Sequence, residues 1–324
     1  MNPSIPRLKN ILRELLDTLD PSRQLIDSAI RKSRKASYGD YHVSPGEAAN
    51  TWLRQGILSG QPFAAGKFGA TEARLFGDNL RRVRSGRKIS KLMRGEIYLH
   101  SGVFPTDDIA LNAFCELYAR DAAEVDLLGV WYRRGEAPLI RASVTPLQRN
   151  FVGLRGLEPY YFPDPWSHAL EGKQVLVVSP FKTTIERQYE RRKAVWPGGL
   201  LPDFDLRVLR FPHSRALVGE DGPDGHFRSW REIYDQFCEQ MSNVPFDVAL
   251  VGAGAATLPL AVHARRLGRQ GIGLGGSLQI LFGIMGRRWD RRSSISQLVN
   301  ENWTRPSGDE VPQKRMLMEN GAYW

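Results

Sequence analysis

Cysteine is scarce in this chain of 324 residues, which contains only Cys115 and Cys238. Each lies in an amphipathic stretch typical of a helix, so both thiols are expected to be free and in a reducing compartment. The chain also lacks an apolar run of the roughly 18 residues that a membrane-spanning helix needs. Residues 1–7 contain no apolar segment of a secretory signal. A cytoplasmic protein is therefore expected.

Several catalytic and binding signatures are missing as well. The six histidines show neither the His-Glu-x-x-His spacing nor a cluster with cysteine, which argues against a zinc enzyme. Neither the Gly-x-Ser-x-Gly elbow of serine hydrolases nor a Walker A phosphate loop occurs. Because no helix-turn-helix or RNA-recognition signature is present, nucleic acid is not an expected partner.

Charge is abundant but unbalanced, with 45 Lys and Arg against 35 Asp and Glu and a formal net charge of +10. Such an excess attracts an anionic partner without identifying it. Seven basic residues lie between Leu80 and Gly95, before the first acid at Glu96, and four more lie between Arg287 and Arg292. A charge run is usually a solvated face. The second run follows a glycine-rich turn and an apolar stretch, which makes it a candidate anion site.

The pattern of apolar residues predicts the fold. With 42% hydrophobic and 25% charged residues the chain is a folded globular protein, and its length suits two domains or one large α/β domain. Residues 1–60 are predicted to be a helical segment, with periodic stretches at 8–19 and 25–34. From 61 to 324, short apolar runs alternate with helical stretches, which predicts a Rossmann-like α/β domain whose mostly parallel sheet is flanked by helices. The expected strands are 61–66, 125–132, 174–178, 206–211, 246–251 and 270–274. The expected helices are 71–84, 184–195, 230–241, 258–267 and 277–285, the last ending at Gly286.

The most informative stretch is Gly252-Ala253-Gly254, which joins a predicted strand to a predicted helix. This layout points free backbone N–H groups at an anion. Thr257 replaces the third glycine of the dinucleotide fingerprint, and glycines follow the next strand where a nicotinamide site has an acidic residue. Both departures from the fingerprint argue against an NAD-binding site. The alternative interpretation is that the glycines only tighten the turn between strand and helix, without binding a ligand.

The next turn repeats the arrangement. Gly275 and Gly276 follow the last predicted strand, and Ser277 is a natural N-cap for the helix after it. Because neighbouring parallel strands end at the same edge of a sheet, the two turns are expected to form a ligand crevice there. Arg287 and Arg288 lie further along and suit a diphosphate as bidentate donors. The sequence therefore predicts a phosphate site.

A third candidate is Gly66-Lys67-Phe68-Gly69-Ala70-Thr71-Glu72. Lys67 is expected at the end of a strand, where its charge can bind phosphate. Glu72 is expected in the first turn of a helix, where the helix dipole favours a carboxylate in any case. A carboxylate there can also orient a sugar hydroxyl or act as a base.

This third stretch resembles the Arg-Phe-Gly-Asp-Gly-Glu type motif of bacterial GT-D-fold glycosyltransferases. Residues 175–181, with Ile185 and Gln188-Tyr189 downstream, are similar to the central strand-loop-helix segment of that family. Residues 246–290, above all 275–290, resemble its C-terminal signature, and the tail segments 303–306, 310–312 and 319–324 also fit its members. The resemblance covers about residues 61–324.

The resemblance implies a GT-D-type fold that binds a nucleotide-activated sugar and transfers the glycosyl group to an acceptor hydroxyl in bacterial glycan or polysaccharide synthesis. The implied partners are a nucleotide-sugar donor and a glycan, glycoprotein or lipid-linked acceptor. A peripheral contact with the inner face of the membrane is left open. In the family the two motif carboxylates are associated with metal and nucleotide-sugar binding. Glu72 matches the second of these carboxylates, but Ala70 stands in place of the first. A divalent metal, Mn²⁺ or Mg²⁺, is therefore doubtful, because a lone carboxylate binds a hard cation poorly. No cofactor is assigned.

The predicted catalytic residues are Glu72 and Arg288. Together with Lys67 and the helix N-termini, Arg288 is expected to stabilise the charge of the departing diphosphate. The predicted substrate-binding residues are Lys67, Gly69, Ser179, Phe181, Gly252, Gly254, Gly275, Gly276, Ser277, Gln279 and Arg287.

Other functions remain open at this point. Ala70 suggests a sugar-nucleotide-binding protein without catalysis, and the Gly252-Ala253-Gly254 turn suggests an NAD(P)-dependent enzyme. A binder of nucleic acid or of membrane surfaces would use the basic run between Leu80 and Gly95. The sequence does not identify the donor sugar and base, the acceptor and linkage, the anomeric outcome or the oligomeric state.

Overall fold

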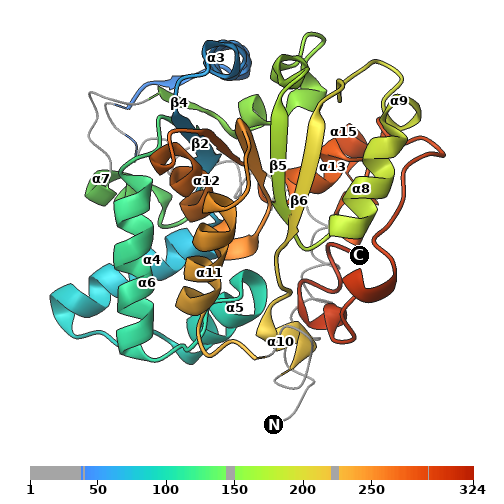
Figure 1. The fold of residues 1–324 in the computed structure, drawn as a ribbon. Helices are drawn as coiled ribbons and strands as arrows, with labels where there is room; N and C mark the ends of the chain where they lie inside the picture. Colours follow the sequence, from blue (N-terminus) through green and yellow to red (C-terminus); the bar gives the residue numbers. More distant parts are fainter. Residues whose placement is uncertain (1–37, 39–40, 144–149, 220–225, 291) are drawn as a thin grey trace, which may run out of the picture.

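The computed structural model describes residues 38, 41–143, 150–219, 226–290 and 292–324. The two helices predicted at 8–19 and 25–34 lie outside these residues. The described chain forms one eight-stranded parallel sheet with helices on both faces (Figure 1), which confirms the predicted fold class. The strands are β1 (Val43–Ser44), β2 (Phe63–Lys67), β3 (Leu127–Val130), β4 (Asn150–Gly153), β5 (Gln174–Ser179), β6 (Asp205–Arg210), β7 (Val248–Val251) and β8 (Gln270–Gly273).

The strand order brings distant parts of the sequence to the middle of the sheet. The order is β1-β4-β3-β2-β8-β7-β5-β6, and all neighbouring pairs are parallel. β8, the last described strand in the sequence, pairs with both β2 and β7. The carboxyl ends of β2, β8, β7 and β5 therefore lie side by side, at the edge where open α/β sheets bind ligands.

Helices cover both faces of this sheet (Figure 1). Helix α12 (Thr257–Arg266) packs on β2, β7 and β8, and α6 (Asp108–Ala122) and α11 (Trp230–Ser242) pack against α12. Helix α4 (Ala70–Ser85) packs against α6. Helix α3 (Gly46–Ser59) packs on β4 and on the 3₁₀ helices η2 (Leu154–Leu157) and η4 (Trp166–Leu170). The α-helices are α3 (Gly46–Ser59), α4 (Ala70–Ser85), α5 (Lys91–Ser101), α6 (Asp108–Ala122), α7 (Glu136–Ser143), α8 (Lys182–Glu190), α9 (Arg192–Val195), α10 (Arg215–Val218), α11 (Trp230–Ser242), α12 (Thr257–Arg266), α13 (Ser277–Leu281), α14 (Arg287–Asp290) and α15 (Ser293–Ser296). The 3₁₀ helices are η2 (Leu154–Leu157), η3 (Pro159–Tyr161), η4 (Trp166–Leu170), η5 (Gly254–Ala256), η6 (Gly308–Glu310) and η7 (Arg315–Leu317).

Successive side chains of the central strands enter two separate cores. Along β5, Leu176 and Val178 pack into the core on one face, whereas Val175 and Val177 pack into the core on the other. A strand that is buried on both faces is apolar throughout. That is why the run at 174–178 could be recognised as a strand.

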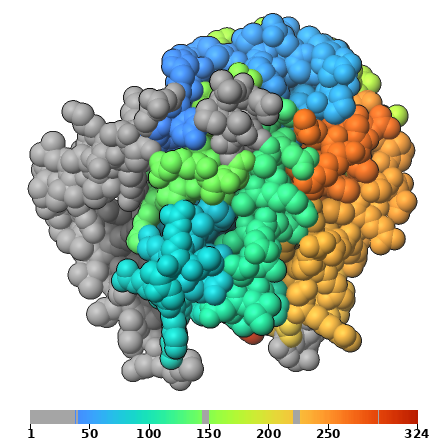
Figure 2. Space-filling view, turned by 90° about the vertical axis from the view of Figure 1, so that its left-hand side faces the viewer, coloured from blue at the N-terminus to red at the C-terminus, as the bar shows by residue number. Residues whose placement is uncertain are grey.

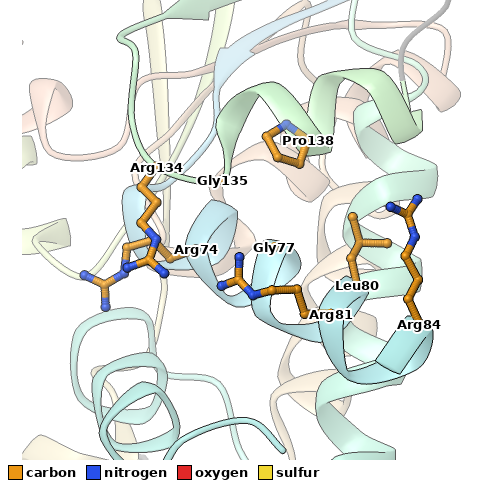
Figure 3. Close-up of a pocket in the computed structure, with 8 residues that line it drawn as sticks. All are labelled: Arg74, Gly77, Leu80, Arg81, Arg84, Arg134, Gly135 and Pro138. Atoms are coloured by element: carbon orange, nitrogen blue, oxygen red, sulfur yellow. The ribbon is translucent and has the colours of Figure 1, made fainter. Parts of the chain in front are cut away.

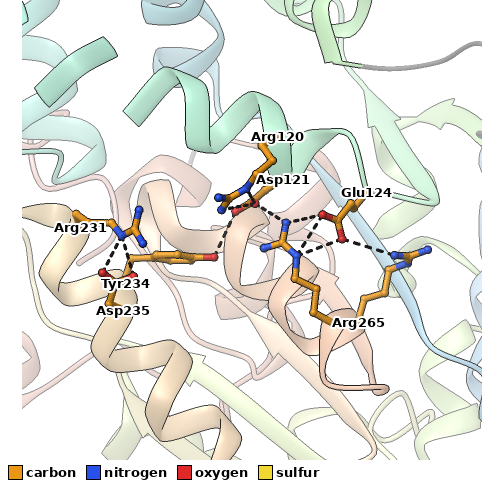
Figure 4. A network of polar contacts seen from close by, with 8 residues as sticks. Arg120, Asp121, Glu124, Arg231, Tyr234, Asp235 and Arg265 are labelled. Carbon is orange, nitrogen blue, oxygen red and sulfur yellow. Dashed lines mark hydrogen bonds and ion pairs between the residues drawn. The ribbon is translucent and has the colours of Figure 1, made fainter. Parts of the chain in front are cut away.

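A network of charged side chains ties α6, α11 and α12 together on one face (Figure 4). Asp121 is completely buried. It accepts hydrogen bonds from Arg120 at 3.0 Å, from Arg266 at 2.6 Å and from the hydroxyl of Tyr234 at 3.3 Å. Arg266 also donates to Glu124 at 2.6 Å. Because a buried carboxylate is stable only when it is paired, these contacts fix the three helices relative to one another.

Two predicted helices have different bounds in the structure. The helix predicted at 277–285 ends at Leu281, and it is Gly283, not Gly286, that has a left-handed φ of 65°. The chain turns there because Ile284 forms a β-bridge with Thr304. The helix predicted at 184–195 is divided between α8 and α9.

The described end of the segment 1–60 is part of the main fold. β1 pairs with β4 at one edge of the sheet. Leu53 and Ile57 of α3 are buried in the same core as Val177. Residues 43–59 therefore extend the α/β unit instead of forming a separate helical segment. Among the residues that the structure describes, no helix is long and apolar enough to cross a bilayer.

Candidate functional site

A cavity of about 1250 Å³ opens at the carboxyl ends of β2, β8, β7 and β5. Six Lys or Arg side chains and three glutamates line it, so its walls carry an excess of positive charge. The structure brings eleven of the thirteen predicted site residues to this one cavity. They are Lys67, Gly69, Glu72, Ser179, Phe181, Gly252, Gly254, Gly275, Gly276, Gln279 and Arg288.

The other two predicted residues, Ser277 and Arg287, are not among the residues that line the cavity. Ser277 was predicted to be an N-cap, and this is wrong, because Gly276 occupies that position and α13 begins at Ser277. The Ser277 hydroxyl donates instead to Glu158 at 2.9 Å. Arg287 donates to the carbonyl of Asn320 at 3.1 Å.

Glu72 lies in the first turn of α4, as predicted. Its side chain is 6% exposed and folds back over Gly69, where an added Cβ would lie 1.8 Å from its Oε2 atom. Within the described part of the chain, no hydrogen bond or ion pair satisfies this carboxylate. A buried charge without a protein partner, at the wall of a cavity, is a candidate for contact with a ligand.

Lys67 ends β2, also as predicted, and the residue as a whole is half-buried. Nζ lies 4.8 Å from the centroid of the Trp131 ring. No described carboxylate forms an ion pair with it. Burial lowers the pKa of Lys67, and the charges of Glu72 and Glu158 oppose that shift. An ammonium with an aromatic face beside it and no anionic partner favours an incoming anion.

Trp131 and Arg133, which the sequence analysis missed, complete this wall. The guanidinium of Arg133 lies 4.5 Å from the Trp131 ring centroid, and the indole N–H donates to the carbonyl of Phe68 at 3.1 Å. The completely buried carboxylate of Glu136 accepts from the backbone N–H of Arg133 at 3.1 Å and so holds the loop. In the sequence, only their position could have marked these two residues as part of the site, since both directly follow β3, the neighbour of β2.

The N-terminus of α4 opens into the same cavity, since residues 69–72 all line it. Gly69 is the N-cap and supplies no capping side chain, and its own N–H donates to the hydroxyl of Tyr118 at 3.2 Å. The first intrahelical bond is donated by Ala73. The N–H groups of residues 70–72 therefore lack an intrahelical acceptor and add positive potential beside Lys67.

The two glycine turns touch each other at the floor of the cavity. The N–H groups of Gly252 and Gly275 donate to neighbouring strands at 2.9 and 3.0 Å. The expectation that the turns offer free N–H groups is thus wrong at these two positions. A Cβ added at Gly252 would lie 2.8 Å from the carbonyl of Gly275, so close packing requires the glycine. Thr257, in place of the third glycine, accepts from the N–H of Ala253 at 2.9 Å and closes its turn.

Arg288 is held by the C-terminal tail. Its Nη1 donates to the hydroxyl of Tyr323 at 2.8 Å, and its Nη2 donates to the carboxylate of Glu319 at 2.7 Å. Gly276 lies beside it, since an added Cβ would come within 3.4 Å of Nη1. Glu319 partly neutralises Arg288, which leaves Lys67 as the stronger attraction for an anion.

Gln279 and the buried end of β5 shape the remaining wall. Gln279 donates to the carbonyl of Tyr323 at 2.9 Å, and its buried Oε1 has no partner in the described chain. Ser179 accepts from the N–H of Phe181 at 3.3 Å, which fixes that turn. His100 of α5 lines the cavity as well and was not predicted. Burial lowers the pKa of this imidazole, and Glu319 opposes the shift.

A Mn²⁺ or Mg²⁺ site does not fit the side chains around Glu72. Ala70 provides no oxygen ligand, and the other two glutamates of the cavity, Glu96 and Glu319, are each paired with an arginine. Hard cations take several oxygen ligands. Over the ranges that the structure describes, no three His, Cys, Asp or Glu side chains are grouped so as to hold a metal ion.

A second, smaller recess of about 270 Å³ lies between α4 and α7 (Figure 3). Four arginines gather around it, of which Arg74 is paired with Glu96 and Arg81 with Asp78. None of the predicted site residues lines it. The lining residues are Arg74, Gly77, Leu80, Arg81, Arg84, Arg134, Gly135 and Pro138. The recess holds no nucleophile or carboxylate, so the larger cavity is the candidate active site.

No family model, no curated protein and no solved structure matches this chain.

Proposed function

We propose that the protein is a glycosyltransferase that moves a sugar from a nucleotide-sugar donor to an acceptor hydroxyl in bacterial glycan or polysaccharide synthesis. The observation that carries the proposal is the pair Lys67 and Glu72. They are opposite charges on one strand-to-helix turn, they line the same cavity, and neither has an ion-pair partner among the described residues. The motif resemblance around this turn supports glycosyl transfer as the reaction class.

In the proposed reaction, the positive wall binds the diphosphate of the donor. Lys67 and the N–H groups at the start of α4 face the phosphates, and Arg288 of α14 adds charge beside Gly276. Charge develops on the diphosphate as its bond to the anomeric carbon breaks. Fixed positive groups in a partly dehydrated cavity stabilise that charge most when it is greatest, which lowers the barrier.

Glu72 is proposed to act on the acceptor. Its carboxylate takes the proton of the acceptor hydroxyl while the hydroxyl oxygen forms a bond to the anomeric carbon and the diphosphate leaves. The cavity volume of about 1250 Å³ exceeds the usual upper range of small-molecule sites, about 1000 Å³, and so has room for donor and acceptor together.

A thermal-shift panel of sugar nucleotides, free nucleotides and NAD(P), each with Mn²⁺, Mg²⁺ or chelator, tests the binding half of the proposal. One sugar nucleotide is expected to raise the melting temperature with chelator present, because a ligand of the native state stabilises it by mass action. A shift with NAD(P) alone, or no shift with any sugar nucleotide, would reject the proposal.

Glu72→Gln tests the catalytic half, with the exposed Glu239→Gln as the matched control. A general base contributes about 100- to 10000-fold, so turnover of the identified donor should fall by at least about 100-fold in E72Q. Donor binding should persist, and E239Q should match the wild type. Unchanged turnover in E72Q would remove this residue from the mechanism.

Ala70 favours a second candidate, a sugar-nucleotide-binding protein without catalysis. It predicts the same thermal shift, with neither hydrolysis nor transfer of the bound donor by the wild type. Product analysis by mass spectrometry separates the two functions.

A further inference from the structure

The basic run between Leu80 and Gly95 contains two kinds of residue. Some form hydrogen bonds within the fold, since Arg82 donates to Asn112 at 3.0 Å and Arg94 donates to Asp108 at 2.5 Å. Others are exposed and have no ion pair in the described chain. They are Arg84, Arg87, Lys88 and Lys91.

Large apolar side chains are exposed in the same region. Val83 near the end of α4 is 63% exposed, Leu92 in the first turn of α5 is 64% exposed, and Ile109 in the first turn of α6 is 84% exposed. The bonds from Arg82 and Arg94 to α6 hold these three helix ends together. Figure 2 shows the segment around residues 80–100 directly beside α6 on one face of the molecule. We call residues 83–92 with Ile109 the α4–α5 corner.

The α4–α5 corner reaches the mouth of the large cavity. Lys91 and Leu92 line that cavity and are also exposed, so they lie at its rim. On another part of the rim, Leu317 is 54% exposed and Arg292 is exposed. Exposed apolar and basic side chains thus occur together at two parts of the entrance to the candidate active site.

We infer that the α4–α5 corner docks the cavity mouth on an anionic bilayer. Apolar side chains enter the boundary between headgroups and acyl chains, while Lys and Arg bind the anionic headgroups around them. The combination of basic and exposed apolar side chains favours a bilayer over a nucleic acid as the partner. A nucleic acid would bind the four cations but would leave Val83, Leu92 and Ile109 in water. This inference does not depend on the proposed function. If both hold, the acceptor reaches Glu72 from the membrane surface.

Sedimentation of the full chain with vesicles tests the inference. Binding is expected to phosphatidylglycerol-phosphatidylcholine vesicles and not to phosphatidylcholine alone, and it should weaken as salt is added. Arg87→Gln with Lys88→Gln should weaken binding about 25-fold, since each basic residue contributes about fivefold, or about 1 kcal/mol. Val83→Ser with Ile109→Ser should also weaken it, although no charge changes.

A matched control keeps the net charge equal. Arg187→Gln with Lys193→Gln removes two exposed basic residues from α8 and α9, away from the corner, and should bind vesicles as the wild type does. Circular dichroism and thermal melting without ligand check that every variant is folded. Equal loss in the control and corner variants, equal binding to uncharged vesicles, no binding, or displacement of the vesicles by duplex DNA would each overturn the inference. A chain that binds vesicles but no sugar nucleotide would refute only the proposed function.

Discussion

Lys67 has an aromatic ring on one side and the open cavity on the other, and its environment makes its charge sensitive to pH. Burial lowers its pKa from the usual 10.5, so the ammonium loses its proton at a lower pH than an exposed lysine does. A bound diphosphate favours the protonated form. Affinity for the donor should therefore be full below the lowered pKa and fall as the pH rises through it.

Lys67→Arg should remove this pH dependence, because a guanidinium stays charged throughout the accessible range. Lys67→Met should weaken donor binding about 10- to 100-fold at neutral pH, as expected for the loss of a charged hydrogen bond. Calorimetric titration of the donor at several pH values measures both effects. If wild type and K67R lost affinity in parallel, the ionisation would belong to another group.

At the scale of single residues, the turns between strand and helix were the part of the site that the sequence could predict. Lys67 and Glu72 could be placed because a strand pattern ends and a helix pattern begins between them. Trp131, Arg133 and His100 could not, because no spacing marks them and only strand pairing and helix packing bring them to the cavity.

Among the elements, α11 depends on its N-terminal cap. Ser229 accepts from the N–H of Glu232 at 3.1 Å, and Glu232 in turn accepts from the N–H of Arg228 at 2.7 Å. Ser229→Ala leaves a helix-end N–H group without this acceptor and should cost about 1 kcal/mol of unfolding free energy. Since α11 carries Trp230 into the cavity wall, donor affinity should fall as well.

Denaturant unfolding measures the loss, with Ser242→Ala at the other end of α11 as the comparison. The exposed Ser242 hydroxyl donates to the carbonyl of Cys238 within the last turn and makes a long contact of 3.4 Å with Nε2 of His263, so its removal should change stability by less than about 0.5 kcal/mol. Equal losses in the two variants would show that the cap is not what stabilises this helix.

Six strands and several helices were predicted from the sequence, whereas β1, β4, α5 and α6 were not. β1 has two residues and β4 has four, of which Phe151 and Val152 are buried. So short a run shows no periodicity, and its pairing with neighbours defines it as a strand. The break after Leu281 was missed for the same reason, since the bridge from Ile284 to Thr304 joins distant segments.

Across the whole molecule, buried titratable groups make stability depend on pH. Burial raises the pKa of Glu136 above its usual 4.5. Between the usual and the raised pKa, the folded state binds more protons than the unfolded state, so this group's contribution is full at low pH and is lost as the pH rises. His100 and His263 have lowered pKa values through burial and act in the opposite direction.

Glu136→Gln isolates the glutamate contribution, because wild type and variant share both histidines. The wild type should lose more stability than E136Q as the pH rises above the usual glutamate value of 4.5 and through the raised pKa of Glu136. Melting curves across this range measure the difference, and E239Q should follow the wild type. A difference of the opposite sign would contradict the raised pKa.

The position of β8 affects how the chain emerges from the ribosome. This strand lies between β2 and β7, yet it follows every other described strand in the sequence. Until residues 270–273 are translated, a four-stranded half (β1-β4-β3-β2) and a three-stranded half (β7-β5-β6) each present an open edge. Open edges pair readily with other chains. The nascent protein is thus exposed to aggregation through these edges until β8 joins the two halves.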